Sequence, residues 1–177
     1  MPNCPDVRNQ YGKYCRDEDS SSMELPTTLV DICAGDFLGS DTTDSRLVAA
    51  LISTDVAWDT DLATTRVNAK AAFKGVAQGE IDSEDGVCNA RPDGIPIARY
   101  RAGSSWTRAY QIVDASGVAE PTTWVRGQGF TFAKNASSNA LVNDKIVKSS
   151  TAAHIVFKAV NDSGPTATAY AEVEFSA

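Results

Sequence analysis

The clearest pattern in this chain is an alternation of apolar and polar residues at its C-terminal end. Between residues 169 and 175, Ala, Ala, Val and Phe alternate with Tyr and two Glu. An earlier run, residues 153–160, alternates in the same way, and the turn-forming segment 161–165 separates the two. A period of two is typical of strands with one buried face. Turn formers between two such runs predict a closing antiparallel hairpin.

Short apolar runs separated by turn signals extend this pattern back to residue 95. Turn signals recur about every 8–12 residues, which is typical of an immunoglobulin-like β-sandwich. The Cys…Trp…Cys pattern of true immunoglobulin domains is missing, so the sequence predicts the architecture alone. Besides the hairpin, the expected strands are residues 97–101, 106–113, 122–126, 130–133 and 141–148.

The N-terminal half has a different character. Residues 1–45 are rich in Pro, Ser, Asp and Gly and predict an extended arm, which we expect a neighbouring copy or another protein to hold. Residues 46–94 predict a helical and loop segment packed on the sandwich of residues 95–177. The predicted fold class is thus mainly β (α+β), with one or two short helices.

Two helices are expected in the middle segment. The first would follow an N-cap at Thr43 or Asp44, and the second would span about residues 59–77. The apolar residues at helical spacing are Leu47, Val48, Leu51 and Ile52 in the first helix, and Leu62, Val67, Ala71 and Phe73 in the second.

The charge of the chain is acidic and unevenly distributed. The net charge is −7 over 177 residues, with −9 in residues 1–90 and +2 in residues 91–177. Such a balance argues against nucleic acid as a partner, because phosphate contacts need clustered Lys and Arg. The asymmetry has two interpretations, which are solvated acidic loops or complementary surfaces that meet between copies of the chain.

No targeting or membrane segment is recognisable. The first residues, Met-Pro-Asn-Cys-Pro-Asp, lack the basic and apolar stretches of a secretory signal. No run approaches the roughly 18 apolar residues of a membrane span. We therefore expect the protein to be made in a cytoplasm and to have no membrane partner.

The four cysteines are Cys4, Cys15, Cys33 and Cys88. Cys4 and Cys15 could close a small disulfide loop, whereas the absence of a secretory signal favours free thiols. A zinc site is not expected, because there is no Cys-x-x-Cys pair and the single histidine lies far away. We expect no metal and no cofactor.

Arginine and aromatic residues gather between residues 91 and 108. These residue types are enriched at protein interfaces, and Arg99 and Arg101 would share one face of a strand. They could be exposed charges that discourage edge pairing, or an anchor for the acidic arm of a neighbouring copy. The candidate interface residues are Arg91, Arg99, Tyr100, Arg101, Trp106 and Arg108.

Catalytic patterns are weak. His154 is the only imidazole, and it alternates with apolar residues in a predicted strand, so we expect it at the surface or between subunits. Asp59 and Asp61 beside Trp58 are the best pair of carboxylates for acid–base chemistry. A structural role is favoured, because Trp58 more often packs in a core and Asp59 more often caps a helix. The sequence therefore predicts a protein that is not an enzyme.

Two segments resemble a known family. The strings "RAGSSWTRAYQIVDASGVAEPTTW" (residues 101–124) and "AVNDSGPTATAYAEVEF" (residues 159–175) resemble the immunoglobulin-like domains of tailed-bacteriophage virion proteins. The resemblance implies a virion structural protein, a capsid decoration or tail component, that assembles with copies of itself and other virion proteins. The alternative is a surface adhesin or carbohydrate-binding module, which would need an exposed stripe of Trp106, Tyr110 and Trp124.

Overall fold

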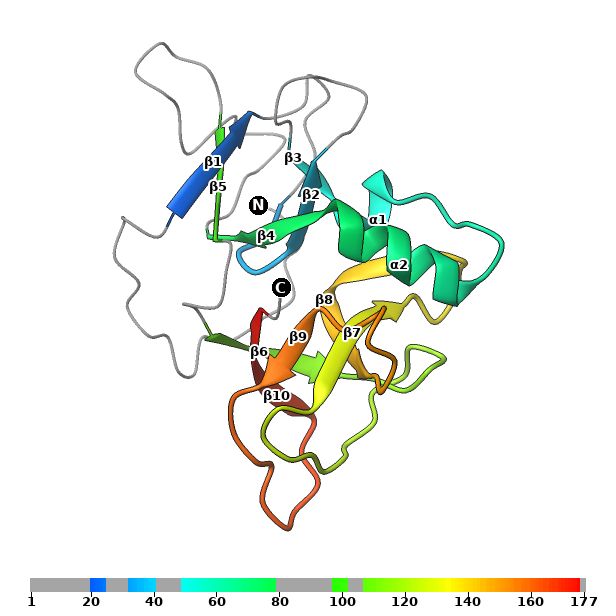
Figure 1. The fold of residues 1–177 in the computed structure, drawn as a ribbon, viewed down its shortest axis with the longest axis vertical. Helices are drawn as coiled ribbons and strands as arrows, with labels where there is room; N and C mark the ends of the chain where they lie inside the picture. Colours follow the sequence, from blue (N-terminus) through cyan, green and yellow to red (C-terminus); the bar gives the residue numbers. More distant parts are fainter. Residues whose placement is uncertain (1–19, 25–31, 41–48, 79–96, 102–106, 176–177) are drawn as a thin grey trace.

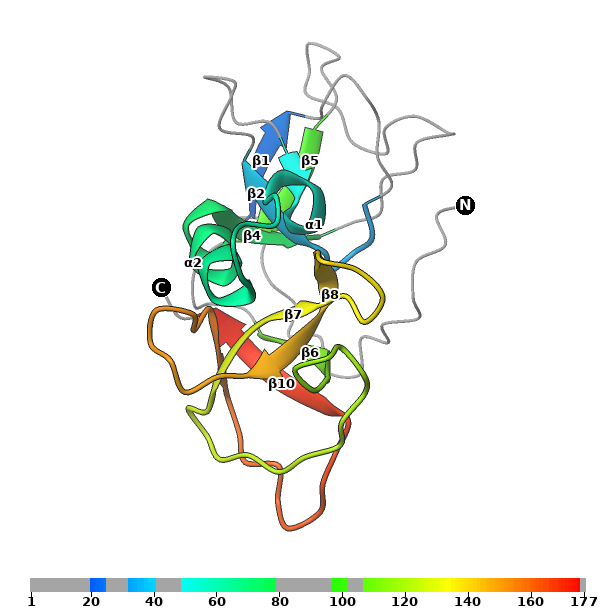
Figure 2. The same cartoon turned by 90° about the vertical axis from the view of Figure 1, so that its right-hand side faces the viewer.

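The computed structural model describes residues 20–24, 32–40, 49–78, 97–101 and 107–175. These residues form a mainly β protein with two short helices, which confirms the predicted class. The strands belong to two bodies, an open five-stranded sheet and a closed five-stranded barrel. In two views at right angles, the sheet lies at one end of the molecule and the barrel at the other (Figure 1, Figure 2).

The open sheet has the order β1-β5-β4-β2-β3, and its neighbouring strands pair antiparallel. β1 is therefore an edge strand, and its partner is β5, with Ser21 opposite Tyr100. A register shift between Leu38 and Gly39 bends β2 where it pairs with β4. The five strands are β1 (Ser20–Glu24), β2 (Phe37–Ser40), β3 (Ala49–Leu51), β4 (Phe73–Ala77) and β5 (Ile97–Arg101).

The barrel has the order β10-β6-β8-β7-β9, and β9 closes it by pairing with β10. β6 and β8 run parallel, with Ile112 opposite Ile146, and the other pairs are antiparallel. A parallel pair needs a crossover connection, and β7 lies within that connection. The five strands are β6 (Thr107–Ile112), β7 (Gly129–Lys134), β8 (Leu141–Lys148), β9 (Phe157–Ala159) and β10 (Tyr170–Phe175).

The predicted immunoglobulin-like sandwich is wrong, because strands of the C-terminal half form a closed barrel. Residues 97–101 do form a strand, but it joins the other sheet, between β1 and β4. The predicted strand at 122–126 is reduced to one isolated bridge, Thr122 to Thr168. Five strands then remain, and closing them into one barrel pairs every edge, which two separate sheets could not do.

The C-terminal hairpin is confirmed, with one shortened strand. β9 and β10 pair antiparallel, and on β10 the side chains of Ala171 and Val173 are buried while Tyr170 is exposed. The first strand begins at Phe157, because residues 152–154 form a turn in which the His154 N–H donates to the Thr151 carbonyl, 2.9 Å away. His154 is therefore not a strand residue.

The first predicted helix is confirmed only in part. Its expected N-cap, Thr43 or Asp44, and the residues up to Val48 lie outside the described residues. Residues 49–51 form β3, and only a single turn, α1 (Ile52–Asp55), is helical. Pairing of Leu51 with Leu38 extends the backbone there and overrides local helical preference. The barrel caps this short helix, because the Asn143 Oδ1 atom accepts from the Ser53 N–H at 2.8 Å and the Asn143 amide donates to Ser53 Oγ at 2.8 Å.

Asn143→Ala is expected to destabilise the protein by about 1–2 kcal/mol, because it leaves the Ser53 N–H and hydroxyl without this partner. Urea unfolding followed by circular dichroism measures the loss. Asn143→Asp keeps an acceptor for the Ser53 N–H and should lose less. Equal losses in the two variants would contradict the role of this reciprocal bond.

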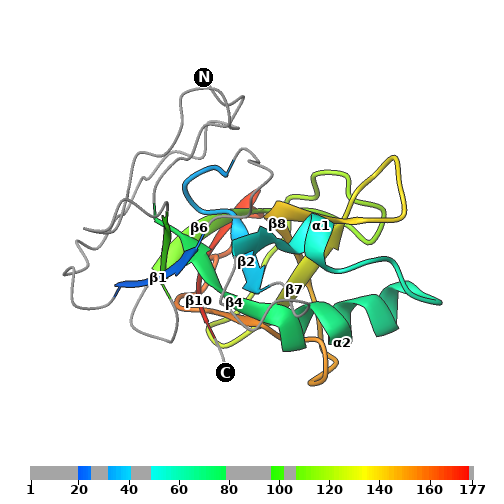
Figure 3. The same cartoon turned by 90° about the horizontal axis from the view of Figure 1, so that it is seen from above.

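The second predicted helix is confirmed over α2 (Leu62–Ala72), which runs along one side of the molecule (Figure 3), but residues 73–77 of its predicted range form the strand β4. Its buried residues are Thr65 and Ala69, whereas Val67 is 41% exposed, so the predicted apolar face was wrong at Val67 and Ala71. Leu62 and Phe73 of that face do pack in the core. Thr65 tolerates burial because its hydroxyl donates to the Asp61 carbonyl and accepts the Asp59 N–H.

Asp61 is the N-cap of α2, and its Oδ1 atom accepts from the Thr64 N–H at 2.7 Å. Asp61→Ala removes this acceptor, so we expect a loss of helical signal and a Tm lower by roughly 2–4 °C. Asp61→Asn keeps the acceptor and should stay close to the parent. Thermal unfolding by circular dichroism tests both variants, and an unchanged Tm in Asp61→Ala would contradict the cap.

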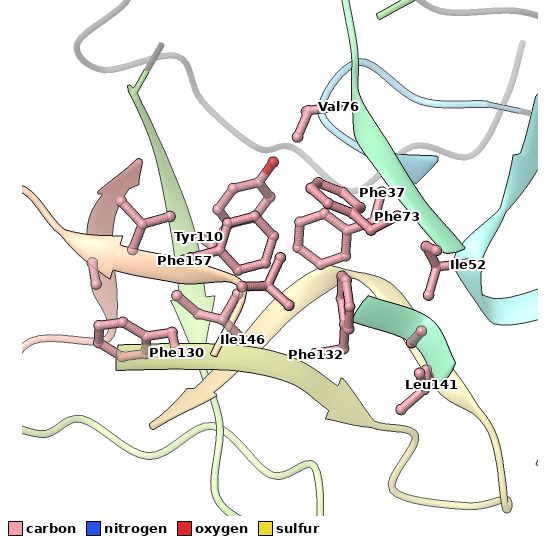
Figure 4. Close-up of a cluster of buried hydrophobic side chains, with 14 of the residues drawn as sticks. Phe37, Ile52, Phe73, Val76, Tyr110, Phe130, Phe132, Leu141, Ile146 and Phe157 are labelled. Atoms are coloured by element: carbon pink, nitrogen blue, oxygen red, sulfur yellow. The ribbon is translucent and has the colours of Figure 1, made fainter. Parts of the chain in front are cut away.

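One aromatic core joins the two bodies (Figure 4). Phe37 on β2 is fully buried, and its ring centre lies 4.9 Å from Tyr110, 5.2 Å from Phe132 and 5.1 Å from Phe157, all on barrel strands. Phe73 on β4 lies 5.5 Å from both Phe132 and Phe157. The strand pairing and the core therefore cross the boundaries predicted at residues 45 and 94.

Candidate functional site

The candidate site is a four-residue turn, Cys33–Asp36, at the junction of the sheet and the barrel. Toward the sheet, the Gly35 N–H donates to the Ala77 carbonyl at 2.8 Å, and the Ala77 N–H donates to the Asp36 carbonyl at 2.9 Å. Toward the barrel, the Tyr110 hydroxyl donates to the Gly35 carbonyl at 2.9 Å. The turn is therefore bonded to β4 on one side and β6 on the other.

Arg108 on β6 holds the same turn. Its Nη2 atom donates to the Ala34 carbonyl at 2.5 Å, and its guanidinium carbon lies 5.9 Å from the centre of the Tyr110 ring. Its Nε atom is buried and has no hydrogen-bond partner among the described residues. Gly35 has a φ of +99°, and a Cβ there would overlap the Arg108 guanidinium, so only glycine fits.

Asp36 is the buried charge of this site, with 8% of its surface exposed. Its Oδ2 atom accepts from the Cys33 N–H at 2.8 Å. Burial raises the pKa of this carboxyl to about 6, and the negative charge of Asp144 also raises the pKa. The hydrogen bond from Cys33 and the positive charge of Arg108 act in the opposite direction and lower the pKa. Asp36 is thus an acid that titrates near neutrality, in a structural turn.

The six predicted interface residues do not come together as one described patch. Arg108 lies at the junction, as an internal clamp. Arg99, Tyr100 and Arg101 lie on β5, which pairs with β1 and β4. Arg91 and Trp106 lie outside the described residues.

Cys33, the first residue of the turn, is disulfide-bonded. The sequence favoured free thiols, and the candidate pair was Cys4 with Cys15. Cys4, Cys15 and Cys88 all lie outside the described residues, so that pairing stays a prediction. The disulfide fixes the turn covalently at the residue whose N–H binds Asp36.

The carboxylates beside Trp58 serve the start of α2. Asp59 accepts from the Thr60 N–H at 2.6 Å and from the Asn68 amide at 3.0 Å, and these bonds lower its pKa. The bond from Thr64 lowers the pKa of Asp61. A general acid needs a raised pKa. Both of these carboxylates have a lowered pKa instead, as expected of groups that accept hydrogen bonds at the start of a helix. The Lys134 ammonium lies 5.9 Å from the Trp58 ring centre.

Two of the three aromatic residues that a binding stripe would need are in the core. Tyr110 is 1% exposed and Trp124 is 6% exposed, with its ring centre 6.3 Å from that of Phe130. Trp106 lies outside the described residues. Tyr110 and Trp124 therefore cannot form the exposed stripe expected of a carbohydrate-binding surface.

Gly35 and Asp36 were missed by the sequence analysis, because it treated residues 1–45 as an extended arm, and Tyr110 was considered only as a residue of a binding stripe. A signal was present, because Ala34-Gly35-Asp36 separates the apolar segments 29–32 and 37–38. A small residue, a glycine and an acid between two apolar runs is typical of a tight turn. The role of Tyr110 has no local signal, since its partner is 75 residues away.

Comparison with protein-family models, curated proteins and solved structures finds no match for this chain. Within the described ranges, no group of three or more His, Cys, Asp or Glu residues could hold a metal ion. None of the helices in those ranges is long and apolar enough to cross a membrane.

Proposed function

We propose that this chain is a non-enzymatic structural protein of a tailed-phage virion, a capsid decoration or a tail component, that assembles with copies of itself and with other virion proteins. The observation that carries the proposal is the pairing of β1 with β5. β1 comes from the polar arm, and it is an edge strand whose partner carries Arg99 and Arg101. The resemblance to virion domains supplies the class of particle.

Edge-strand pairing is a suitable contact between copies. The hydrogen bonds that β1 makes with β5 are backbone bonds, so the β1 segment of a neighbouring copy can make the same bonds. The sequence adds charge to this contact, because Asp17-Glu18-Asp19 directly precede β1 and two arginines lie on β5. The assembled form would thus exchange arm strands between copies.

Light scattering and mass photometry at low and high salt test self-assembly. We expect an oligomer or polymer that weakens as salt increases, because screening reduces attraction between exposed charges. Arg99→Glu with Arg101→Glu should weaken it further, while Lys158→Glu on the exposed face of β9 is the matched control. A monomer at every salt and protein concentration would overturn the proposal.

A cross-link tests which contact is used. Ser21→Cys with Tyr100→Cys places two cysteines at opposed positions of β1 and β5, within disulfide reach of each other. In a co-refolded mixture of light and ¹⁵N-labelled chains, exchange gives peptides that link a light to a heavy chain. Ser20→Cys with Tyr100→Cys is the control, because its register is shifted by one residue. An oligomer with only same-isotope links would overturn strand exchange while leaving self-assembly intact.

A further inference from the structure

The turn Cys33–Asp36 holds the sheet and the barrel together through bonds to both. The backbone of Ala77 binds it from β4, and the side chains of Tyr110 and Arg108 bind it from β6. The only charged group within the turn is the Asp36 carboxyl, and it is buried. The carboxyl accepts from the Cys33 N–H, so it is part of the turn on which the contact between the two bodies depends.

We propose that this turn is a proton-operated latch, which joins the sheet to the barrel more tightly when Asp36 is protonated than when it is ionised. The proposal concerns the folded chain itself and holds whether or not copies assemble. The function it adds is a pH-dependent stiffness of the junction, set by one buried acid.

Burial has the largest influence on the Asp36 pKa and favours the neutral form, whereas the hydrogen bond from the Cys33 N–H favours the ionised form. From β6, Arg108 is a nearby cation among the described residues and also favours the ionised form, although its Nη2 atom donates to the Ala34 carbonyl. Tyr110 on the same strand stays neutral, because burial raises the pKa of its hydroxyl. From β8, Asp144 adds a second negative charge, and β4 contributes the backbone of Ala77. The Cys33 sulfur is in a disulfide and does not titrate.

The direction of the effect follows from linkage between protonation and opening. In the closed turn the pKa of Asp36 is about 6, and in an opened, hydrated turn it returns toward 3.8. Below about pH 4 both forms are protonated, and the latch has its full strength. As the pH rises from 4 to 6 the open form ionises first, so opening becomes easier by up to about a hundredfold. Above pH 6 both forms are ionised, and the change is complete.

Two amides report directly on the latch. The Gly35 and Ala77 N–H groups are both bonded within it, and their hydrogen exchange requires it to open. The experiment measures their protection factors in the full oxidised chain between pH 4.5 and 7.5, together with the ¹³C titration of the Asp36 carboxyl. We expect a carboxyl midpoint near 6 and a loss of protection of about tenfold to a hundredfold across this range.

Three variants separate this proposal from a general effect of pH. Asp36→Asn keeps a side-chain oxygen for the Cys33 N–H and should make protection independent of pH. Asp144→Asn retains Asp36 and removes a neighbouring negative charge, so the midpoint and the loss of protection should both move to lower pH. Asp114→Asn removes a carboxylate at the start of a turn elsewhere on the barrel, and should leave both unchanged.

The proposal is overturned if the Asp36 carboxyl titrates near pH 4, or if protection of Gly35 and Ala77 follows the same pH course in Asp36→Asn as in the parent. Should Asp36→Asn fail to fold, Asp144→Asn decides the question alone. An Asp36 midpoint and exchange profile that do not move in Asp144→Asn would then overturn the latch.

Discussion

Phe37→Ala is expected to destabilise the protein by about 3–5 kcal/mol. Phe37 is fully buried, and its ring lies between the sheet and the barrel, in contact with Tyr110, Phe132 and Phe157. Truncation loses the apolar burial of the ring and leaves a cavity at the junction, which the surrounding strands can fill only in part. Because domains are stable by about 5–15 kcal/mol, this loss is a large share of the total.

Guanidinium unfolding followed by circular dichroism measures this loss. Phe37→Leu fills much of the same space and should lose less. Val125→Ala, at a side chain that is 66% exposed, should change stability by less than about 0.5 kcal/mol. A loss below about 1 kcal/mol in Phe37→Ala would mean that the aromatic core closes around the gap, so that Phe37 does not join the two bodies.

Gly35→Ala is the second change with a large expected effect, a loss of about 2–5 kcal/mol. A residue with a side chain is strained at a φ of +99° by about 1–2 kcal/mol. The added Cβ also overlaps the Arg108 guanidinium, and overpacking of this kind costs about 1–3 kcal/mol. Arg108 cannot easily move away, since it donates to the Ala34 carbonyl.

The chain offers a matched control for the backbone strain. Gly127 has a φ of +80°, and no atom lies within 4 Å of a Cβ built there. Gly127→Ala should therefore show the strain without the overlap. The double variant Gly35→Ala with Arg108→Ala should lose less than the sum of its single variants, because the overlap is gone. If Gly35→Ala is no more destabilised than Gly127→Ala, the overlap with Arg108 does not contribute to the loss of stability.

These two variants also test how the junction relates to assembly. The Phe37→Ala or Gly35→Ala change is combined with the cysteine pair Ser21→Cys and Tyr100→Cys. If arm exchange needs only β1 and β5, the cysteines should still cross-link at temperatures where the combined variant stays folded. Loss of cross-linking in folded Gly35→Ala would show that the position of β5 depends on the turn, which binds the neighbouring strand β4.

Most strands of the C-terminal half were predictable, because local patterns determine them. Residues 97–101 and 141–148 form strands at the predicted bounds, and the alternation of buried Ala171 and Val173 with less buried neighbours marks β10. The second helix followed from its helix formers, whereas its N-cap is Asp61 and not Asp59, the capping candidate of the sequence. Periodicity and capping act over a few residues, so they are visible in sequence.

The helix face shows where local patterns stop. Val67 is apolar and exposed, while Thr65 is polar and buried, because the Thr65 hydroxyl finds its partners at Asp59 and Asp61. A hydrophobicity pattern cannot anticipate a polar group whose hydrogen bonds are complete after folding. The predicted helix at Leu51 became a strand for a related reason, since its partner Leu38 is distant in the chain.

The sequence by itself determined the fold class, most of the strands of the C-terminal half, the C-terminal hairpin and most of the second helix. Only the tertiary structure decided that the strands form a sheet and a closed barrel, that Arg108 clamps an internal turn, and that Asp36 is a buried acid. Each of these depends on pairs such as Tyr110 with Gly35, whose residues are far apart along the chain. Long-range contacts decide burial, and burial decides both the partner of a side chain and its charge.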